Sequence, residues 1–278
     1  NFASINFNSL GDNILKDTNS LRSRMINNLK IQSNDYFTKN GLKNNFNYYL
    51  KNSINAGKNN IEYDSSPHVK FMNIFEFISS FPLIDKNENY INYLNPKASL
   101  RINPSSMKNY KNENRPINND NIFNLNRLGL IDTLEAGENL TLGLEYKKEK
   151  IDNINKYFEL KLGTVLRNKS NGNIPSNSTI NKKRSNYFGA ITNSLNDNLT
   201  LKYEFSINHG LSEVQYNSFG TTFSKNNFVT TFNYIEENGV IGSTNILENV
   251  TTFSFDGQNH IKFKTRDNRE IDLTEYYD

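Results

Sequence analysis

The chain has 278 residues, of which 35% are hydrophobic, below the ordinary share of a globular protein. Its 19 Phe and 15 Tyr are spread along the chain, and an aromatic content of 12% argues against a disordered segment. The formal net charge is +3, with 32 basic and 29 acidic residues well mixed, so no basic block indicates nucleic-acid binding. The absence of cysteine excludes disulfides, thiolate zinc sites and cysteine nucleophiles.

No apolar run in the sequence approaches the ~18 residues that a membrane helix needs. The best candidate, residues 71–84, is interrupted by Asn73, Glu76 and a serine pair. We therefore do not expect a helical membrane protein.

The dominant pattern is an alternation of apolar and polar side chains with period two. It is clearest at residues 94–103, 140–147, 158–167 and 199–208. Successive side chains of a strand point to opposite faces, so each segment has one apolar and one polar face. Weaker runs lie at residues 2–10, 24–33, 42–54, 187–195, 213–224, 228–235, 247–255 and 261–265. The sequence thus predicts roughly 12 to 14 antiparallel strands of about 8 to 12 residues each.

Short polar turns tend to alternate with long loops. Turns rich in Asn, Asp and Gly, which tolerate the positive φ of tight hairpins, are expected at residues 196–198, 225–227 and 256–259. Longer loops are expected at residues 56–67, 104–137, 168–184 and 237–246. This alternation is typical of a membrane barrel with short periplasmic turns and long outer loops.

The alternation also fits a soluble β-sandwich, which hides one face of each strand. Two features favour the barrel. The expected strands are nearer the ~9 to 11 residues of a membrane strand than the soluble mean of ~5 to 6. The polar faces also mix charged residues and Asn with Gly and Ser, as in a hydrated lumen. We expect an all-β protein, an antiparallel transmembrane β-barrel.

The barrel is expected to be partial. The chain starts at Asn1 and stops at Asp278 within an expected strand, which suggests a piece of a longer protein. We expect an open sheet with unpaired edge strands and no ladder between residues 2–10 and 271–277. The apolar face should point outward and the polar face inward. The residues expected to point outward are Leu140, Leu142, Leu144, Leu199, Leu201, Tyr203 and Phe205.

A motif between two of the most regular segments resembles one of the outer-membrane lipopolysaccharide-assembly family (the organic solvent tolerance or LptD family). The residues in matching order are Asn126, Arg127, Gly129, Asp132, Glu135, Gly137 and Gly143. The sequence departs from the family at Thr133, where Arg is usual, and at Leu142, where an aromatic residue is usual. Residues 93–98 and 271–277 resemble two further family segments. The resemblance is good over residues 93–278 and vague over residues 1–92.

The resemblance implies that residues 1–278 are a fragment of the barrel domain, without the N-terminal periplasmic domain and the barrel-closing C-terminal strands. It implies transport of lipopolysaccharide (LPS) and its insertion into the outer leaflet of the bacterial outer membrane. The implied partners are LPS, outer-membrane lipid, a lipoprotein that plugs the lumen and periplasmic LPS-bridge proteins. The barrel would open sideways between its first and last strands. The alternatives are a general porin or receptor barrel, or a soluble β-rich adhesin or surface structural protein.

The loop that contains the motif is the first candidate site. The motif residues Asn126, Arg127, Gly129, Asp132, Glu135 and Gly137 are candidates for a lumen or gating loop. We hypothesise that the loop folds back against the lumen wall and fixes Arg127 against Asp132 or Glu135. The alternative is a solvated, mobile extracellular loop.

The polar strand faces are the second candidate site. The residues expected to face the lumen are Lys97, Arg101, Glu145, Lys147, Glu159, Lys161, Arg167, Lys202 and Glu204. They are candidates for binding the anionic sugar-phosphate of LPS, the alternative being ordinary hydration and cross-strand charge pairing. We expect no catalytic residues, metal site or cofactor, because the three histidines are far apart in sequence and no nucleophile–base pair stands out.

Overall fold

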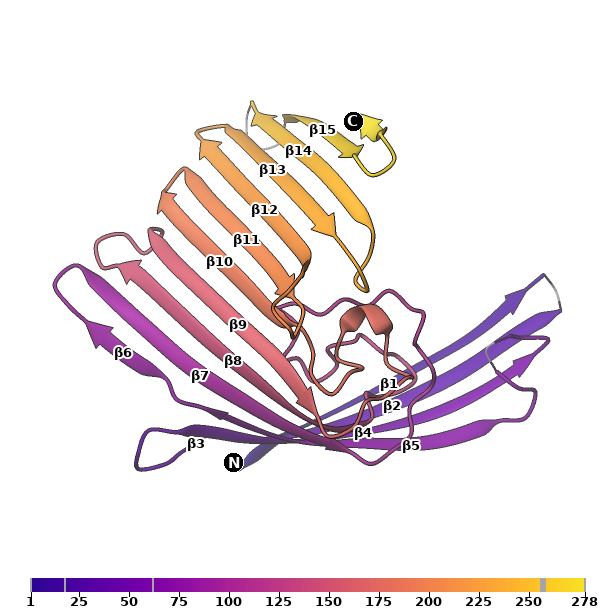
Figure 1. Cartoon of the computed structure of the whole chain (residues 1–278). Helices are drawn as coiled ribbons and strands as arrows, with labels where there is room; N and C mark the ends of the chain where they lie inside the picture. The colour runs from indigo at the N-terminus through magenta and orange to yellow at the C-terminus, as the bar shows by residue number, and fades with distance from the viewer. Residues whose placement is uncertain (1, 18, 62, 256–258, 278) are drawn as a thin grey trace.

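The computed structural model describes residues 2–17, 19–61, 63–255 and 259–277, and forms one antiparallel sheet of 16 strands (Figure 1). Fourteen strands follow one another in sequence order, and the short β3 and β6 pair with β4 and β7. The strands are β1 (Ala3–Lys16), β2 (Ser20–Ser33), β3 (Tyr36–Phe37), β4 (Lys43–Lys58), β5 (His68–Ser80), β6 (Leu83–Lys86), β7 (Tyr90–Asn103), β8 (Gly137–Lys150), β9 (Tyr157–Arg167), β10 (Tyr187–Asn196), β11 (Leu199–Ile207), β12 (Val214–Lys225), β13 (Phe228–Glu237), β14 (Thr244–Ser254), β15 (His260–Asn268) and β16 (Leu273–Tyr277).

The all-β class, the antiparallel pairing and the number of strands on the main path agree with the sequence prediction. The predicted lengths are too short for the first half of the sheet, where β1, β2, β4, β5, β7 and β8 have 13 to 16 residues. The reason is that strands pair through backbone hydrogen bonds, which continue through polar ends that carry no apolar alternation. No helix in the described part of the chain is long and apolar enough to cross a membrane.

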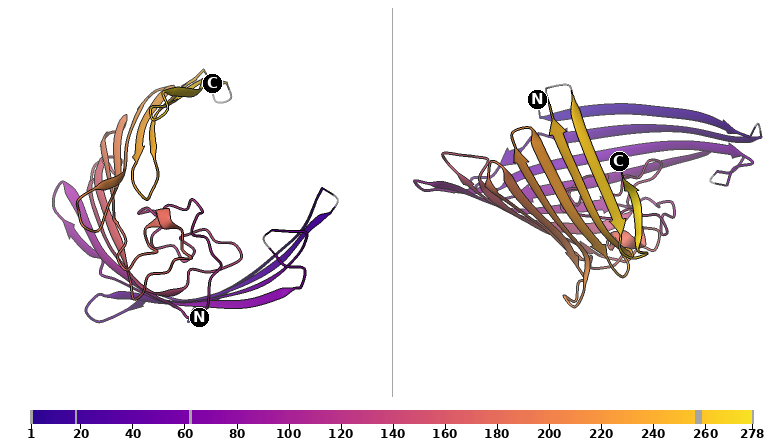
Figure 2. Two further views of the ribbon diagram at one scale, coloured as in Figure 1. Left: turned by 45° about the vertical axis from the view of Figure 1, so that its right-hand side comes forward. Right: turned by 90° about the horizontal axis from the view of Figure 1, so that it is seen from above.

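The sheet curls into an open curve with one concave face (Figure 2). Strands β1 and β16 lie at the two ends of the sheet order, and the described residues form no ladder between them, as expected. The predicted hairpin turn at residues 256–259 falls mainly outside the described residues.

The apolar strand face points away from the concave side. Leu142 is 38% exposed, and the other six side chains expected to point outward are half-buried rather than freely exposed. The described chain has a single sheet, so none of these side chains is sandwiched between two sheets, and the sandwich alternative is wrong. Large exposed apolar side chains on the same convex face include Phe7, Phe46, Phe71, Phe75, Leu100, Phe219, Phe232 and Phe263.

The two longest connections leave the same rim of the sheet, because consecutive antiparallel strands alternate in direction. On this rim lie residues 59–61 and 63–67, 104–136, 168–186, 208–213 and 238–243. The opposite rim has two-residue connections at 197–198 and 226–227, and longer ones at 34–42, 81–89 and 151–156. The predicted alternation of short turns and long loops is therefore present from β9 to β14 but not in the first half of the sheet.

Two of the long connections fill the concave side of the sheet (Figure 2). They are residues 104–136, called the plug from here on, and residues 168–186, which include the short 3-10 helix η1 (Ser176–Ser178). The main apolar core joins the plug, the second loop and the wall, with Ile122 from the plug, Ile174 from the second loop and Phe188 from β10. The interior of this molecule thus lies between the loops and the sheet.

Candidate functional site: the plug and its docking surface

A buried ion pair stands at the centre of the plug. Arg127 Nε donates to Glu135 Oε2 and Arg127 Nη2 to Glu135 Oε1, each at 2.7 Å. The Arg127 side chain is fully shielded from solvent. Its guanidinium also donates to the wall residues Thr141 and Asn139 at 2.9 and 3.0 Å. The contact hypothesised from the sequence is therefore present, with Glu135 as the partner, and it ties the plug to β8.

The concave wall supplies two more buried arginines to the plug. Arg167 from β9 donates to the Glu135 carboxylate and to the carbonyl oxygen of Ala136. Arg101 from β7 donates to the carbonyl oxygen of Phe123 at 2.7 Å and to the carboxylate of Glu76 on β5 at the same distance. Each arginine thus holds a plug carbonyl while a buried carboxylate balances its charge, the arrangement that a buried charge requires.

The electrostatics of this cluster keep Glu135 ionised. Burial by itself would raise the pKa of Glu135, since it penalises the charged form. The charge and hydrogen bonds of Arg127, together with the charges of Arg167 and Arg101, outweigh burial and lower this pKa to about 2. The carboxylate is therefore anionic throughout the physiological range.

Asp132 belongs to a second cluster and does not contact Arg127. Its carboxylate accepts hydrogen bonds from Tyr63 at 2.7 Å, from Lys108 at 3.3 Å and from Tyr110. Burial raises its pKa, but these three donors together lower it below the ordinary value. Because Tyr63 lies in the connection between β4 and β5, this cluster joins a further rim loop to the plug. Thr133, at the departure from the family motif, is buried here and accepts from the Lys108 backbone N–H at 3.2 Å.

A pair of glycines forms a notch in the wall for the tip of the plug. Gly143 and Gly163 are opposite one another on β8 and β9. A Cβ atom on Gly143 would lie 2.5 Å from the Phe123 ring, and one on Gly163 would lie 3.1 Å from Ile122. Lys97 of β7 lies over the same Phe123 ring, 4.4 Å from its centre. The absence of two side chains on the wall thus creates the space that the plug tip occupies.

The remaining motif residues shape the plug backbone. Gly129 and Gly137 have φ angles of +61° and +92°, a region that L side chains rarely adopt. Asn126 accepts from the Leu130 N–H and donates to the Leu130 carbonyl oxygen, both at 2.9 Å, and so closes the turn between them. The motif therefore encodes a defined loop conformation as well as the ion pair.

The second loop is bound to the plug by backbone and side-chain hydrogen bonds. The Tyr110 N–H donates to the Asn173 carbonyl oxygen at 2.8 Å, and the Ser176 N–H donates to the Lys111 carbonyl oxygen at 3.0 Å. The Arg115 N–H donates to the Asn177 side chain at 3.1 Å. Residues 168–186 and the plug thus form one joined layer over the wall.

The other polar residues expected to face the lumen pair mainly with their neighbours. Three ion pairs join Lys147 to Glu149, Lys161 to Glu159, and Lys202 to Glu204, at 2.7, 3.1 and 2.8 Å. Glu145 accepts from Asn95 on β7 at 3.2 Å. The three ion pairs lie along single strands, two residues apart, and are not the cross-strand charge pairs of the alternative. Arg101 and Arg167 belong instead to the docking surface of the plug.

Three residues of the site were not identified from the sequence: Glu76, Tyr63 and Lys51. Lys51 of β4 is buried and donates from Nζ to the carbonyl oxygen of Ile131 in the plug. The available signal was Glu76, a lone acid inside the apolar segment 71–84, which was noted only because it breaks a membrane helix. Among the described residues no group of three His, Cys, Asp or Glu side chains has the arrangement of a metal site.

The chain was compared with protein families, with curated proteins and with solved structures. A family model described as LptD, LPS transport system D, matches residues 11–261. The comparison with curated proteins gives no match. Among solved structures the chain is similar to a mutant porin of Rh. blastica, with 10% identity and a TM-score of 0.34 over 95% of this chain and 94% of that chain.

Proposed function

Because the chain belongs to the LptD family of LPS transport proteins, we propose that it is part of an outer-membrane barrel that inserts LPS into the outer leaflet. The observation that carries the proposal is the family match over residues 11–261, which includes both the sheet and the plug. The convex apolar face is suited to contact with lipid and the polar concave face to a hydrated lumen.

The proposal includes the partners that the family implies. These are LPS, outer-membrane lipid, a lipoprotein that occupies the lumen and periplasmic proteins that deliver LPS to the barrel. The protein transports its substrate without covalent chemistry. The chain would be one part of the barrel domain, with the periplasmic domain and the closing strands supplied by the rest of the protein.

We further propose that the plug closes the outer rim of the barrel and moves when LPS passes. The buried pair of Arg127 and Glu135 supports a docked, closed position of the plug. In a freely mobile loop the same pair would be exposed and would contribute about 1 kcal/mol or less. The contacts of the plug with β7, β8 and β9 would couple its position to the shape of the wall.

Depletion of the full-length protein tests the transport function. LPS labelled at the cell surface should fall, and the cells should become sensitive to large hydrophobic antibiotics that intact outer-leaflet LPS excludes. For a general porin, depletion would instead slow the entry of small solutes and leave surface LPS unchanged. That result would overturn the transport proposal.

Complementation with Arg127→Ala tests the closing role of the plug. We expect greater sensitivity to the same antibiotics at a normal protein level, because the plug loses the contacts of Arg127 with Thr141 and Asn139 of β8 and docks less firmly. Arg269→Ala is the matched control, since this side chain is exposed on the connection between β15 and β16. Unchanged sensitivity in the Arg127→Ala strain would leave residues 104–136 as ordinary surface.

A further inference from the structure

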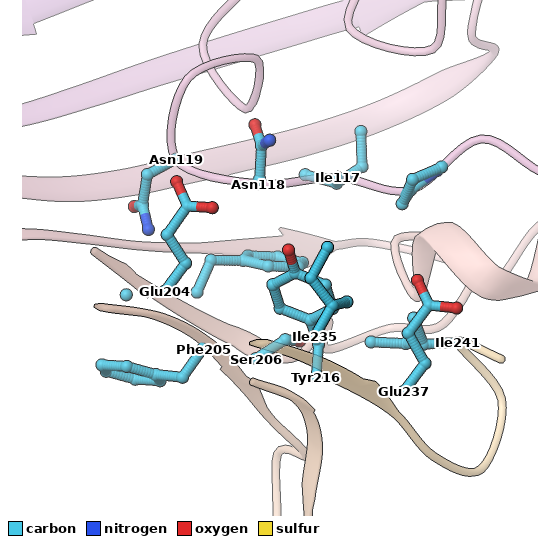
Figure 3. Close-up of a pocket in the computed structure, with 13 residues that line it drawn as sticks. Ile117, Asn118, Asn119, Glu204, Phe205, Ser206, Tyr216, Ile235, Glu237 and Ile241 are labelled. Carbon is cyan, nitrogen blue, oxygen red and sulfur yellow. The ribbon is translucent and has the colours of Figure 1, made fainter. Parts of the chain in front are cut away.

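A cavity separates the plug from the concave face of the later strands. It has a volume of about 190 Å³ and lies between plug residues 116–119 and the wall formed by β10 to β13 (Figure 3). The connection between β13 and β14 closes it at one side through Ile241. This cavity is separate from the charge cluster of Arg127 and Glu135, which faces β8 and β9.

The walls of this cavity are mainly apolar, unlike the charged lumenal surface of β7 to β9. Ile117 of the plug and Phe188 of β10 line it and belong to the main core. Ile235 of β13 and Tyr216 of β12 line the opposite side. A partly enclosed apolar space with a few polar groups at its margin is the usual form of a small-molecule site.

Two carboxylates border the apolar space. Figure 3 shows Glu204 and Glu237 on either side of Tyr216 and Ile235. Glu204 is opposite Ser218 on β12, whereas Glu237 is opposite Tyr216, two residues along the same strand. Strand spacing and rise therefore separate the two Cα atoms by about 12 Å.

The charges at this cavity are only partly balanced. Glu204 pairs with Lys202 at 2.8 Å, but that lysine side chain is 49% exposed. Glu237 accepts a hydrogen bond from Thr244 at 2.8 Å, and none of the ion pairs formed by the described residues includes it. A carboxylate beside an apolar wall gains most from a cation that brings its own apolar body.

We propose that this cavity binds a linear alkyl diamine. The alkyl chain packs between Ile117 and Ile235, and the two ammonium groups bind Glu204 and Glu237. Two carboxylates repel an anionic sugar-phosphate, so this ligand is distinct from the transported LPS. The inference does not depend on the transport function.

Calorimetry of the purified full-length protein in detergent micelles tests this site, with 1,5-diaminopentane as the probe. We expect the diamine to bind about tenfold more tightly than n-pentylamine, because only the diamine forms two charge-assisted contacts. Glu204→Gln and Glu237→Gln should each weaken diamine binding about tenfold. Glu236→Gln is the matched control, because this neighbouring acid accepts a hydrogen bond from Asn217 and does not line the cavity. The Glu236→Gln variant should bind the diamine as tightly as the unchanged protein.

Three further measurements separate binding at this site from general charge attraction and from misfolding. Uncharged 1,5-pentanediol should not bind, and Ile117→Ala should weaken the diamine without removing either acid. The circular dichroism spectrum of each variant should match that of the unchanged protein. Equal binding of the diol, or undiminished diamine binding by the folded Glu204→Gln, Glu237→Gln double variant, would overturn the proposal.

Discussion

Arg127 and Glu135 meet through two hydrogen bonds of 2.7 Å, eight residues apart in the plug, and the same carboxylate also binds Arg167 of the wall. One buried anion therefore balances two buried guanidinium groups. The plug and the wall share this carboxylate, so its loss affects both. Because one acid serves two arginines, substitution of Glu135 should destabilise docking of the plug more than substitution of Arg127 does.

Glu135→Gln should destabilise docking of the plug more than Arg127→Met. The glutamine leaves Arg127 and Arg167 buried without their anion, at a cost of about 3 to 5 kcal/mol, whereas the methionine leaves Glu135 still paired with Arg167. Hydrogen exchange of the plug amides in the full-length protein measures the difference. Glu113→Gln is the control, since this acid lies in the same loop and is half exposed. Equal hydrogen exchange in Glu135→Gln and Arg127→Met would show that Arg167 does not share the negative charge of Glu135 with Arg127.

Gly143→Ala should displace the tip of the plug. The added Cβ would lie 2.5 Å from the Phe123 ring, and overpacking of this kind costs about 1 to 3 kcal/mol. Limited proteolysis should cut the variant faster within residues 104–136. Gly172→Ala is the control, because a Cβ at Gly172 meets no atom within 4 Å. The double variant Gly143→Ala, Phe123→Ala should regain resistance at the tip, and failure to do so would place the strain elsewhere.

Docking of the plug should weaken only in acid. The pKa of Glu135 is lowered from 4.5 to about 2, so its contribution is complete above pH 4.5 and is lost as the pH falls towards 2. A shift of this size corresponds to about 3 kcal/mol over the whole window. The lowered pKa of Asp132 acts with the same sign.

Hydrogen exchange of the plug amides, corrected for the intrinsic effect of pH, follows this transition. Protection should be constant from pH 7 to 5 and decline below that. In Glu135→Gln the remaining dependence should be smaller, since only Asp132 and other acids still titrate. If Glu135→Gln had the same pH profile as the unchanged protein, titration of Glu135 would be excluded as the cause of the loss of protection in acid.

Tyr63→Phe should release the rim loop between β4 and β5 from the plug. The substitution removes a 2.7 Å hydrogen bond to Asp132, which retains Lys108 and Tyr110 as donors, so the expected cost is about 1 kcal/mol. Exchange should rise in residues 59–61 and 63–67 and remain unchanged around Arg127. Tyr36→Phe, on an exposed side chain of β3, should have no effect. A rise that extends to Arg127 would mean that the two clusters act as one unit.

The sequence by itself determined which side chains of a strand share a face, and which charged groups of the plug lie close together in the chain. The alternation of Leu140 and Leu142 with Thr141 assigned an inner and an outer face, because side chains of a strand alternate with period two. The pairing of Arg127 with an acid of its own loop was also predictable, since the two groups are close in the chain. Gly129 and Gly137 belong to the motif read from the sequence, whereas their positive φ angles were seen only in the structure.

The tertiary structure alone decided which acid binds Arg127 and what the wall contributes. Arg101 and Glu76 are 25 residues apart and are brought together by strand register. Arg167 and Glu135 are 32 residues apart and are brought together by docking of the plug on the wall. A slip of one residue would turn each wall side chain to the opposite face, and the side-chain pattern of one strand does not fix its register against the next. The same register sets Gly143 beside Gly163 and so creates the notch that holds the plug.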